Sequence, residues 1–291
     1  AAEEPAIARP SKPSIAVLPF DYVSGDPSYL YLGDGISDEL ITGLSRVSGL
    51  FVIARNSSFS FRGEKQRITS VARALGVRYV VEGSVIVPRS AVTGQPPDRL
   101  KINVRLVDGD TGRQLWADAY NDRFDDIVSV QERLSARVIA GISANLELPS
   151  ATPLASSSEV ALLSQKDTEN PDAYRAFLKG QAAYRQRTPE AYHQALAELN
   201  KAVGLDPKFV RAHGVLAAVY LDIRTLGWYA DSALADIGLN RPRTDARVEE
   251  HRQTAMSASS PPPIALQVTA RIRSRQGLIE AAVAAAEKAV A

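Results

Sequence analysis

The stretch that decides the fold of the second half is Ala202-Val203-Gly204-Leu205-Asp206-Pro207-Lys208-Phe209. A small residue, a short apolar step and Asp-Pro stand before a new amphipathic run, which is typical of one helix ending just before another begins. Both helices carry packing residues at helical spacing. These are Ala195, Leu199 and Ala202 upstream, and His213, Leu216, Ala217 and Tyr220 downstream. The sequence therefore predicts helices that pack side by side around this turn.

This spacing resembles the tetratricopeptide repeat, a helix pair of about 34 residues that stacks on its neighbours. Repeats of this kind are binding scaffolds and not catalysts, so the resemblance implies a protein or peptide partner held in a groove. The groove is expected on the first helix of each pair. Its exposed positions in the second repeat are predicted to be Arg211, Ala218, Leu221 and Asp222.

Other helix pairs are predicted on either side of this turn. Asn170 is expected to cap a helix that begins at Pro171, and Thr188 to cap its partner. Residues 261–263, three prolines, are predicted to begin the last pair. Between them, a short second helix over 232–239 and an extra polar helix over 246–258 indicate an insertion and not a clean repeat.

The first half of the chain is predicted to be α/β. Strands are expected at 14–20, 50–54, 77–87, 100–107 and 114–120, and helices at 29–47, 68–75 and 127–146. Gly76 should end the second helix, and Gly83 should mark a bulge or a close approach. Helical crossovers favour parallel pairing first and short turns favour antiparallel pairing afterwards, so a mixed sheet with flanking helices is predicted.

Several motifs in this half resemble the TolB amino-terminal-like domain. They are 13–20 (PSIAVLPF), 33–35 (GDG) with 38–40 (DEL), 52–55 (VIAR) with 57–59 (SSF), 75–84 (LGVRYVVEGS) and 108–116 (DGDTGRQLW). Such a domain is paired with tetratricopeptide repeats in bacterial class III adenylate cyclases and in winged-helix transcription regulators. The resemblance implies a regulatory or sensory region of such a protein. It carries no cyclase residue over to this chain.

Composition and segment boundaries suggest a chain of two domains. Hydrophobic residues make up 45% of the chain, and cysteine is absent. The net charge is +1, so charge gives no support for a nucleic-acid partner. We expect a linker at 1–13, an α/β domain at 14–148, a linker at 149–170 and a helical domain at 171–291. Both ends are expected to be cuts through a longer protein, with any membrane segment lying upstream.

Candidate sites compete with structural explanations. The phosphate-loop, dinucleotide, zinc-protease and nucleophile-elbow motifs do not occur, so no catalytic residue, metal or cofactor is expected. A polar group after the second strand could hold an anion, although a structural turn is favoured: Arg55, Asn56, Ser57 and Ser58. An acidic group, Asp34, Asp38 and Glu39, could hold a metal, although helix N-terminal charges are favoured.

Three other features have mainly structural explanations. The histidines His193, His213 and His251 lie on different predicted helices, and His213 is expected to pack within the repeat, with pH sensing as an alternative. Trp116 and Tyr120 are expected in the core. The basic run 271–275 is predicted to be a solvated helix face, and otherwise a partner contact.

Two main hypotheses for function remain open. The first is a non-catalytic regulatory module of a signalling protein, which binds a protein or peptide and possesses a homodimer contact. The alternative is a small-ligand sensor of a transmembrane transcription regulator. A third is an enzyme whose site needs segments outside this chain. The TolB-like half favours an extracytoplasmic position slightly over a cytoplasmic one.

Overall fold

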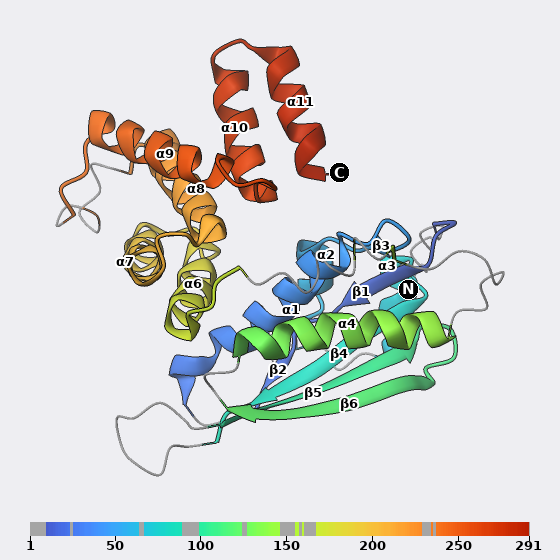
Figure 1. The fold of residues 1–291 in the computed structure, drawn as a ribbon. Helices are drawn as coiled ribbons and strands as arrows, with labels where there is room; N and C mark the ends of the chain where they lie inside the picture. Colours follow the sequence, from blue (N-terminus) through green and yellow to red (C-terminus); the bar gives the residue numbers. More distant parts are fainter. Residues whose placement is uncertain are drawn as a thin grey trace, which may run out of the picture. The chain divides into compact units, whose positions relative to one another are not determined.

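The structure is a computed structural model that describes residues 10–23, 26–63, 67–88, 99–123, 127–145, 155–156, 159, 167–228, 234 and 237–290. The chain divides into two compact units, residues 1–166 and 167–291 (Figure 1). The first contains a sheet with helices and the second contains helices. The division falls inside the segment 149–170. The segment 89–98, between two predicted strands, and most of both predicted linkers lie outside the described residues.

The first unit is built on a mixed sheet. Its strands are β1 (Ser14–Val17), β2 (Asp21–Tyr22), β3 (Phe51–Val52), β4 (Tyr79–Ile86), β5 (Arg99–Asp108) and β6 (Gln114–Arg123). The order is β3-β1-β4-β5-β6, with β2 also paired to β4. Pairing is parallel among β1, β3 and β4 and antiparallel from β4 to β6, which confirms the predicted mixed sheet.

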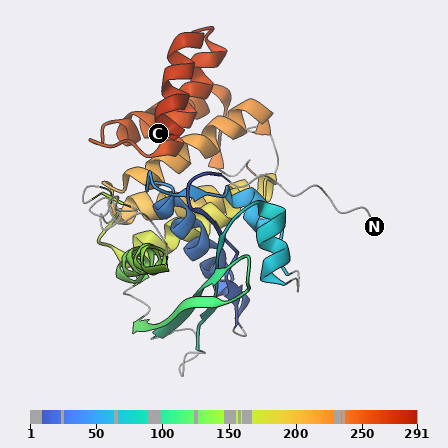
Figure 2. The same cartoon turned by 90° about the vertical axis from the view of Figure 1, so that its right-hand side faces the viewer.

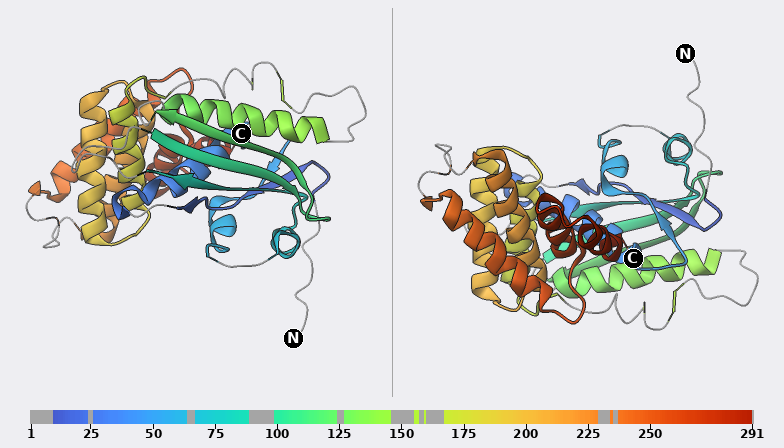
Figure 3. Two further views of the ribbon diagram at one scale, coloured as in Figure 1. Left: turned by 90° about the horizontal axis from the view of Figure 1, so that it is seen from below. Right: turned by 90° about the horizontal axis from the view of Figure 1, so that it is seen from above.

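Helices cover both faces of this sheet. They are η1 (Pro27–Tyr29), α1 (Tyr31–Leu44), α2 (Arg55–Phe59), α3 (Ile68–Leu75) and α4 (Ile127–Asn145). α1 and α4 contact each other and the sheet, and α3 lies on the opposite face from α4 (Figures 2 and 3). Under α3, Val71 and Leu75 pack with Ala16 and Val80. Trp116 lies against Gly141 of α4 but is only half-buried, so its expected core position is met in part.

Two details of the first unit differ from the prediction or refine it. β2 and α2 form outside the predicted strands and helices, because two-residue pairing and a single helical turn leave no periodic signal. Gly83 marks a close approach and not a bulge, since β4 and β5 pair without interruption there. A Cβ at Gly83 would lie 2.5 Å from the Asn103 carbonyl oxygen. Gly76 ends α3 in the left-handed region, as predicted.

The described part of the second unit forms helix pairs. They are α6 (Pro171–Tyr184) with α7 (Pro189–Leu205), α8 (Val210–Leu226) with α9 (Arg241–Met256), and α10 (Pro263–Arg275) with α11 (Ile279–Val290). We call these the first, second and third hairpins. α8 also contacts α6, α7 and α10, so it packs against both other hairpins.

The capping residues explain where these helices begin. Asn170 Oδ1 accepts from the Asp172 and Ala173 amides, and Thr188 Oγ1 accepts from the Ala191 amide, as predicted. At the deciding Asp-Pro turn, Asp206 Oδ2 accepts a 2.5 Å hydrogen bond from the Thr168 hydroxyl. The Ala195, Leu199 and Ala202 side chains are fully buried, which confirms the predicted packing face.

The prediction of an insertion after α8 is wrong. The helix predicted at 246–258 as an extra element is α9, the direct partner of α8 in the second hairpin. Asn240 caps it and Pro242 lies in its first turn, so this proline begins a helix instead of interrupting one. α9 is strongly polar and buries only Thr244, Val248, His251 and Ala255, which concealed its packing face. Most of the short helix predicted at 232–239 lies outside the described residues.

Candidate functional site

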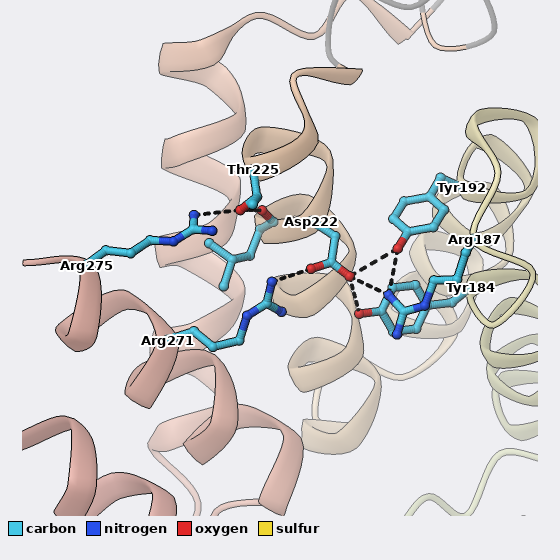
Figure 4. A network of polar contacts seen from close by, with 8 residues as sticks. Tyr184, Arg187, Tyr192, Asp222, Thr225, Arg271 and Arg275 are labelled. Atoms are coloured by element: carbon cyan, nitrogen blue, oxygen red, sulfur yellow. Dashed lines mark hydrogen bonds and ion pairs between the residues drawn. The ribbon is translucent and has the colours of Figure 1, made fainter. Parts of the chain in front are cut away.

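A buried carboxylate lies at the centre of the second unit. The Asp222 side chain on α8 is 8% exposed. Its Oδ2 accepts hydrogen bonds from Tyr184 Oη at 2.7 Å, Tyr192 Oη at 3.0 Å and Arg187 Nη1 at 2.6 Å. Its Oδ1 accepts one from Arg271 Nη2 at 2.5 Å (Figure 4). One side chain therefore connects all three hairpins.

The turn between α6 and α7 positions Arg187. Its backbone φ is +59°, and it is the one non-glycine residue with positive φ in the described part of the chain. A residue with a Cβ atom is strained at positive φ, so the contacts of Arg187 must hold its backbone in this conformation. Arg187 Nη1 also donates to Tyr192 Oη at 2.8 Å, and its guanidinium lies 4.4 Å from the Tyr184 ring centre.

Aromatic rings surround these polar groups. Tyr184 and Tyr192 meet edge to face with ring centres 5.3 Å apart, and Tyr192 meets Trp228 in the same manner at 5.1 Å. Edge-to-face contacts of this kind fix ring orientation. The tyrosine hydroxyl groups are therefore held where they can donate to Asp222.

The electrostatics of this site favour a charged Asp222. Burial alone would raise the pKa of its carboxyl group, but hydrogen bonds from Tyr184 and Arg271 lower the pKa below its usual value. Burial raises the pKa of Tyr192 to about 12, and burial and the Asp222 charge raise that of Tyr184. Both tyrosines thus stay protonated as donors at neutral pH.

The cations outnumber the carboxylate. Arg187 and Arg271 side chains are 58% and 42% exposed although each binds Asp222. One turn along α10, exposed Arg275 donates to Thr225 Oγ1 at 2.6 Å. Three guanidinium groups and one carboxylate give this surface a net charge of +2. We call these three arginines, with Asp222 beneath them, the arginine surface.

A histidine pair lies elsewhere in the second unit. His213 Nδ1 and His251 Nδ1 are 2.9 Å apart, so one ring donates a proton and the other accepts it. His213 Nε2 lies 3.2 Å from the Pro207 carbonyl oxygen, and the Tyr220 ring is stacked on His251. His213 therefore packs within the second hairpin, against α9. Burial and the His213 charge lower the pKa of His251 to about 4.

A cavity of about 250 Å³ lies on another side of α8. Its lining includes the apolar side chain of Leu196, the Tyr220 ring, and the basic residues His193, Arg243 and Arg247. Arg247 already pairs with Glu250 at 2.7 Å, and Arg243 donates to the Gly238 carbonyl. The cavity is therefore small and its cations are partly engaged.

The anion site predicted in the first unit contains paired charges. Arg55 lies 3.2 Å from Asp38 Oδ1 and 3.9 Å from Asp34 Oδ2, and Arg62 also pairs with Asp34. The Arg55 guanidinium lies over the Phe59 ring at 3.7 Å. Asn56, Ser57 and Ser58 lie in the same single helical turn, α2. With both arginines engaged by carboxylates, the arrangement braces α2 against α1, and a role in anion binding stays a prediction.

The exposure predicted for the groove residues is wrong. Arg211, Leu221 and Asp222 are 9%, 0% and 6% exposed, and Ala218 is fully buried. α8 packs against α6, α7, α9 and α10. Positions that would be exposed on a helix with fewer neighbours are therefore covered. Arg211 pairs with Asp167 and stacks on Phe177. Their predicted role in binding is untested.

Sequence reasoning missed the residues that surround Asp222. Tyr184, Arg187, Tyr192 and Arg271 lie between 30 and 49 positions from Asp222 along the chain. No local periodicity links positions so far apart. A usable signal is Asp222 itself, a carboxylate within the apolar run 215–223 of α8, since such a residue needs partners when buried.

The acidic group lies on α1, where Asp34 is in the first turn and Asp38 and Glu39 lie further along, so the expected helix N-terminal position holds for Asp34 alone. Glu39 is 1% exposed. In the parts of the chain that the structure describes, no cluster of three or more potential metal-ligating side chains is found. Nor does any helix within those parts have the length and apolar character to cross a membrane.

Comparisons with known proteins give one clear relative. The chain is 39% identical over 220 residues to a protein of Rhizobium meliloti (strain 1021) named "Putative adenylate cyclase 3". The match spans 76% of this chain and 35% of that protein, so this chain corresponds to about a third of its relative. This relationship supports the adenylate-cyclase association that the sequence motifs imply. No family model matches the chain.

Solved structures show only partial likeness. TolB from Acinetobacter baumannii is 18% identical with a TM-score of 0.35, over 47% of this chain and 30% of that one. Lipoprotein GNA1162 from Neisseria meningitidis is 18% identical with a TM-score of 0.31, over 46% and 99%. A PelC dodecamer from Paraburkholderia phytofirmans is 20% identical with a TM-score of 0.31, over 50% and 96%.

Proposed function

We propose that this chain is a non-catalytic regulatory region of an adenylate-cyclase-type signalling protein. The observation that carries the proposal is the 39% identity to "Putative adenylate cyclase 3", which spans most of this chain but only 35% of the relative. The larger remainder of such a protein has room for the catalytic domain. The mixed sheet and the helical hairpins then form the part that senses or binds.

The helical unit is the proposed site of partner binding. Its three hairpins have the helix pairing expected of tetratricopeptide repeats, and α8 contacts both neighbours of its own hairpin. Stacked helix pairs form extended surfaces for protein or peptide partners. In the proposed mechanism, a partner or a second copy of the chain binds here and changes the output of the attached cyclase.

Cyclic AMP formation tests this proposal. The Rhizobium relative is prepared at full length and with the segment equivalent to this chain deleted, and the 291-residue chain is prepared alone. We expect no cyclic AMP from the chain alone and a change of about fivefold or more in the activity of the deleted protein. Cyclic AMP formed by the chain alone would refute the proposal, as would a deletion that leaves the cyclase rate unchanged.

A further inference from the structure

We propose that the arginine surface binds an extended acidic segment of a partner protein, through carboxylates on alternate residues. This inference rests on the proposed function and names the chemistry of the partner. It begins from three guanidinium groups: Arg187 belongs to the first hairpin, and Arg271 and Arg275 both lie on α10 of the third hairpin. A solvated helix face would not need its cations held in this manner.

Buried Asp222 holds two of these cations in place. Arg187 and Arg271 each direct one nitrogen at its carboxylate, yet 58% and 42% of their side chains remain exposed. A guanidinium group has five N–H donors in a rigid fork and binds carboxylates in pairs of bonds. The hydrogen bonds to Asp222 engage one nitrogen of each group, so the remaining donors can bind a second carboxylate from outside.

Charge and order both favour an acidic ligand. The surface has a net charge of +2 at neutral pH, and no neighbouring carboxylate beyond Asp222 takes part in its hydrogen bonds among the residues that the structure describes. Because Asp222 holds Arg187 and Arg271, and Thr225 holds Arg275, before a ligand arrives, little side-chain entropy is lost on binding. The positive φ of Arg187 indicates that the fold pays a backbone cost to keep this arginine there.

The spacing of the cations identifies the form of the ligand. Arg187 and Arg271 bind opposite oxygens of one carboxylate, so their bonded nitrogens lie within about 7 Å of each other. Arg271 and Arg275 stand four positions apart on α10, where side chains start about 5–6 Å apart. In an extended peptide, alternate side chains lie on one face about 7 Å apart. Glutamates at alternate positions would therefore meet neighbouring arginines.

Fluorescence anisotropy with labelled peptides and the full 291-residue chain tests this inference. Two peptides of equal composition carry three glutamates among serines and glycines, and both ends are blocked. One has the glutamates at alternate positions and the other has them spread at least five positions apart. We expect the alternating peptide to bind about fivefold more tightly, with affinity falling as salt rises. Since both ends are blocked, binding reports side-chain carboxylates and not a chain terminus.

Matched variants locate the site. The test variant is Arg275→Gln, which removes a cation of the arginine surface that donates to Thr225. The control is Arg273→Gln, which removes a cation of the same helix that donates to the Ala281 carbonyl oxygen. We expect Arg275→Gln to lower affinity for the alternating peptide about fivefold and Arg273→Gln to leave it within twofold. Circular dichroism confirms that both variants fold.

Specific outcomes would overturn the inference. Equal affinity for the two peptides would show that the cation spacing selects nothing. Equal losses in the two variants would show that only net charge matters, and equal competition by a single-stranded oligonucleotide would indicate a nucleic-acid partner. Absence of saturable binding would leave the arginines as a brace between hairpins. If the peptides do not bind but the deletion in the cyclase assay still changes activity, the acidic ligand is refuted and the proposed function is retained.

Discussion

Replacing Asp222 by asparagine should destabilise the second unit strongly. The carboxylate has two acceptor oxygens that together receive four hydrogen bonds. An asparagine amide offers one acceptor oxygen, so its NH2 group must face donors on one side. Either Arg271 or the group of Tyr184, Arg187 and Tyr192 then loses its acceptor.

The expected magnitude follows from the burial of each partner. Breaking a buried ion pair from one side costs about 3–5 kcal/mol. Arg187 and Arg271 are about half exposed, so water can partly replace the lost bond, and we expect a loss of about 3 kcal/mol near the lower limit. For a helical unit of this size, that loss corresponds to a fall in Tm of roughly 10 °C.

The two tryptophans allow each unit to be followed separately. Trp116 lies in the first unit and Trp228 in the second, where it meets Tyr192. In a Trp116→Phe background, urea denaturation followed by Trp228 fluorescence therefore reports the second unit. Asp222→Asn should shift the midpoint to lower urea without changing the slope.

Asp245→Asn is the matched control. Asp245 of α9 pairs with Arg224 of α8 at 2.7 Å, within the second hairpin, and its side chain is 42% exposed. Removing such a pair should cost under about 1 kcal/mol. If Asp222→Asn costs no more than Asp245→Asn, the Asp222 carboxylate does not hold the three hairpins together.

Two further predictions concern a buried ring and a close contact. The pKa of His251 lies at about 4 in the folded state, lowered by burial and by the His213 charge. The unfolded chain binds that proton near pH 6.5, so stability should be complete above pH 6.5 and fall by up to about 3 kcal/mol as the pH drops to 4. Urea midpoints of the second unit against pH measure this, and a flat profile, or the same profile in His251→Phe, would contradict it. Gly83→Ala would place a Cβ 2.5 Å from the Asn103 carbonyl oxygen and should destabilise the first unit by about 2 kcal/mol. Trp116 fluorescence should shift to lower urea while Trp228 fluorescence does not, and a shift of both transitions would refute a cause local to the sheet.

Much of the fold was accessible from local sequence signals. Apolar runs gave the strands of the mixed sheet, Gly76 gave the end of α3, and Asn170 and Thr188 gave the starts of α6 and α7. Each signal acts within a few residues. The wrong prediction at α9 arises because a proline is an ambiguous local signal. Pro242 could interrupt a helix or lie in the first turn of one, and the sequence around it does not distinguish the two.

The site could not be predicted in the same manner. Asp222 was selected as an exposed groove residue because helical spacing gives a face but not what covers that face. The covering groups, Tyr184 and Arg271, approach from the first and third hairpins. Only the stacking of the hairpins brings them together, and stacking is a long-range property that composition and periodicity do not record.

A buried aspartate is a costly means of joining three hairpins. Apolar side chains of similar volume would join helices without the desolvation cost of a carboxylate, and often with greater stability. What they would not do is orient Arg187 and Arg271 while leaving about half of each side chain in contact with solvent. The same carboxylate that makes the second unit sensitive to Asp222→Asn therefore prepares a fixed pair of cations at its surface. Stability and recognition are therefore linked through one side chain, whereas Arg275→Gln alters the surface without removing a partner of Asp222.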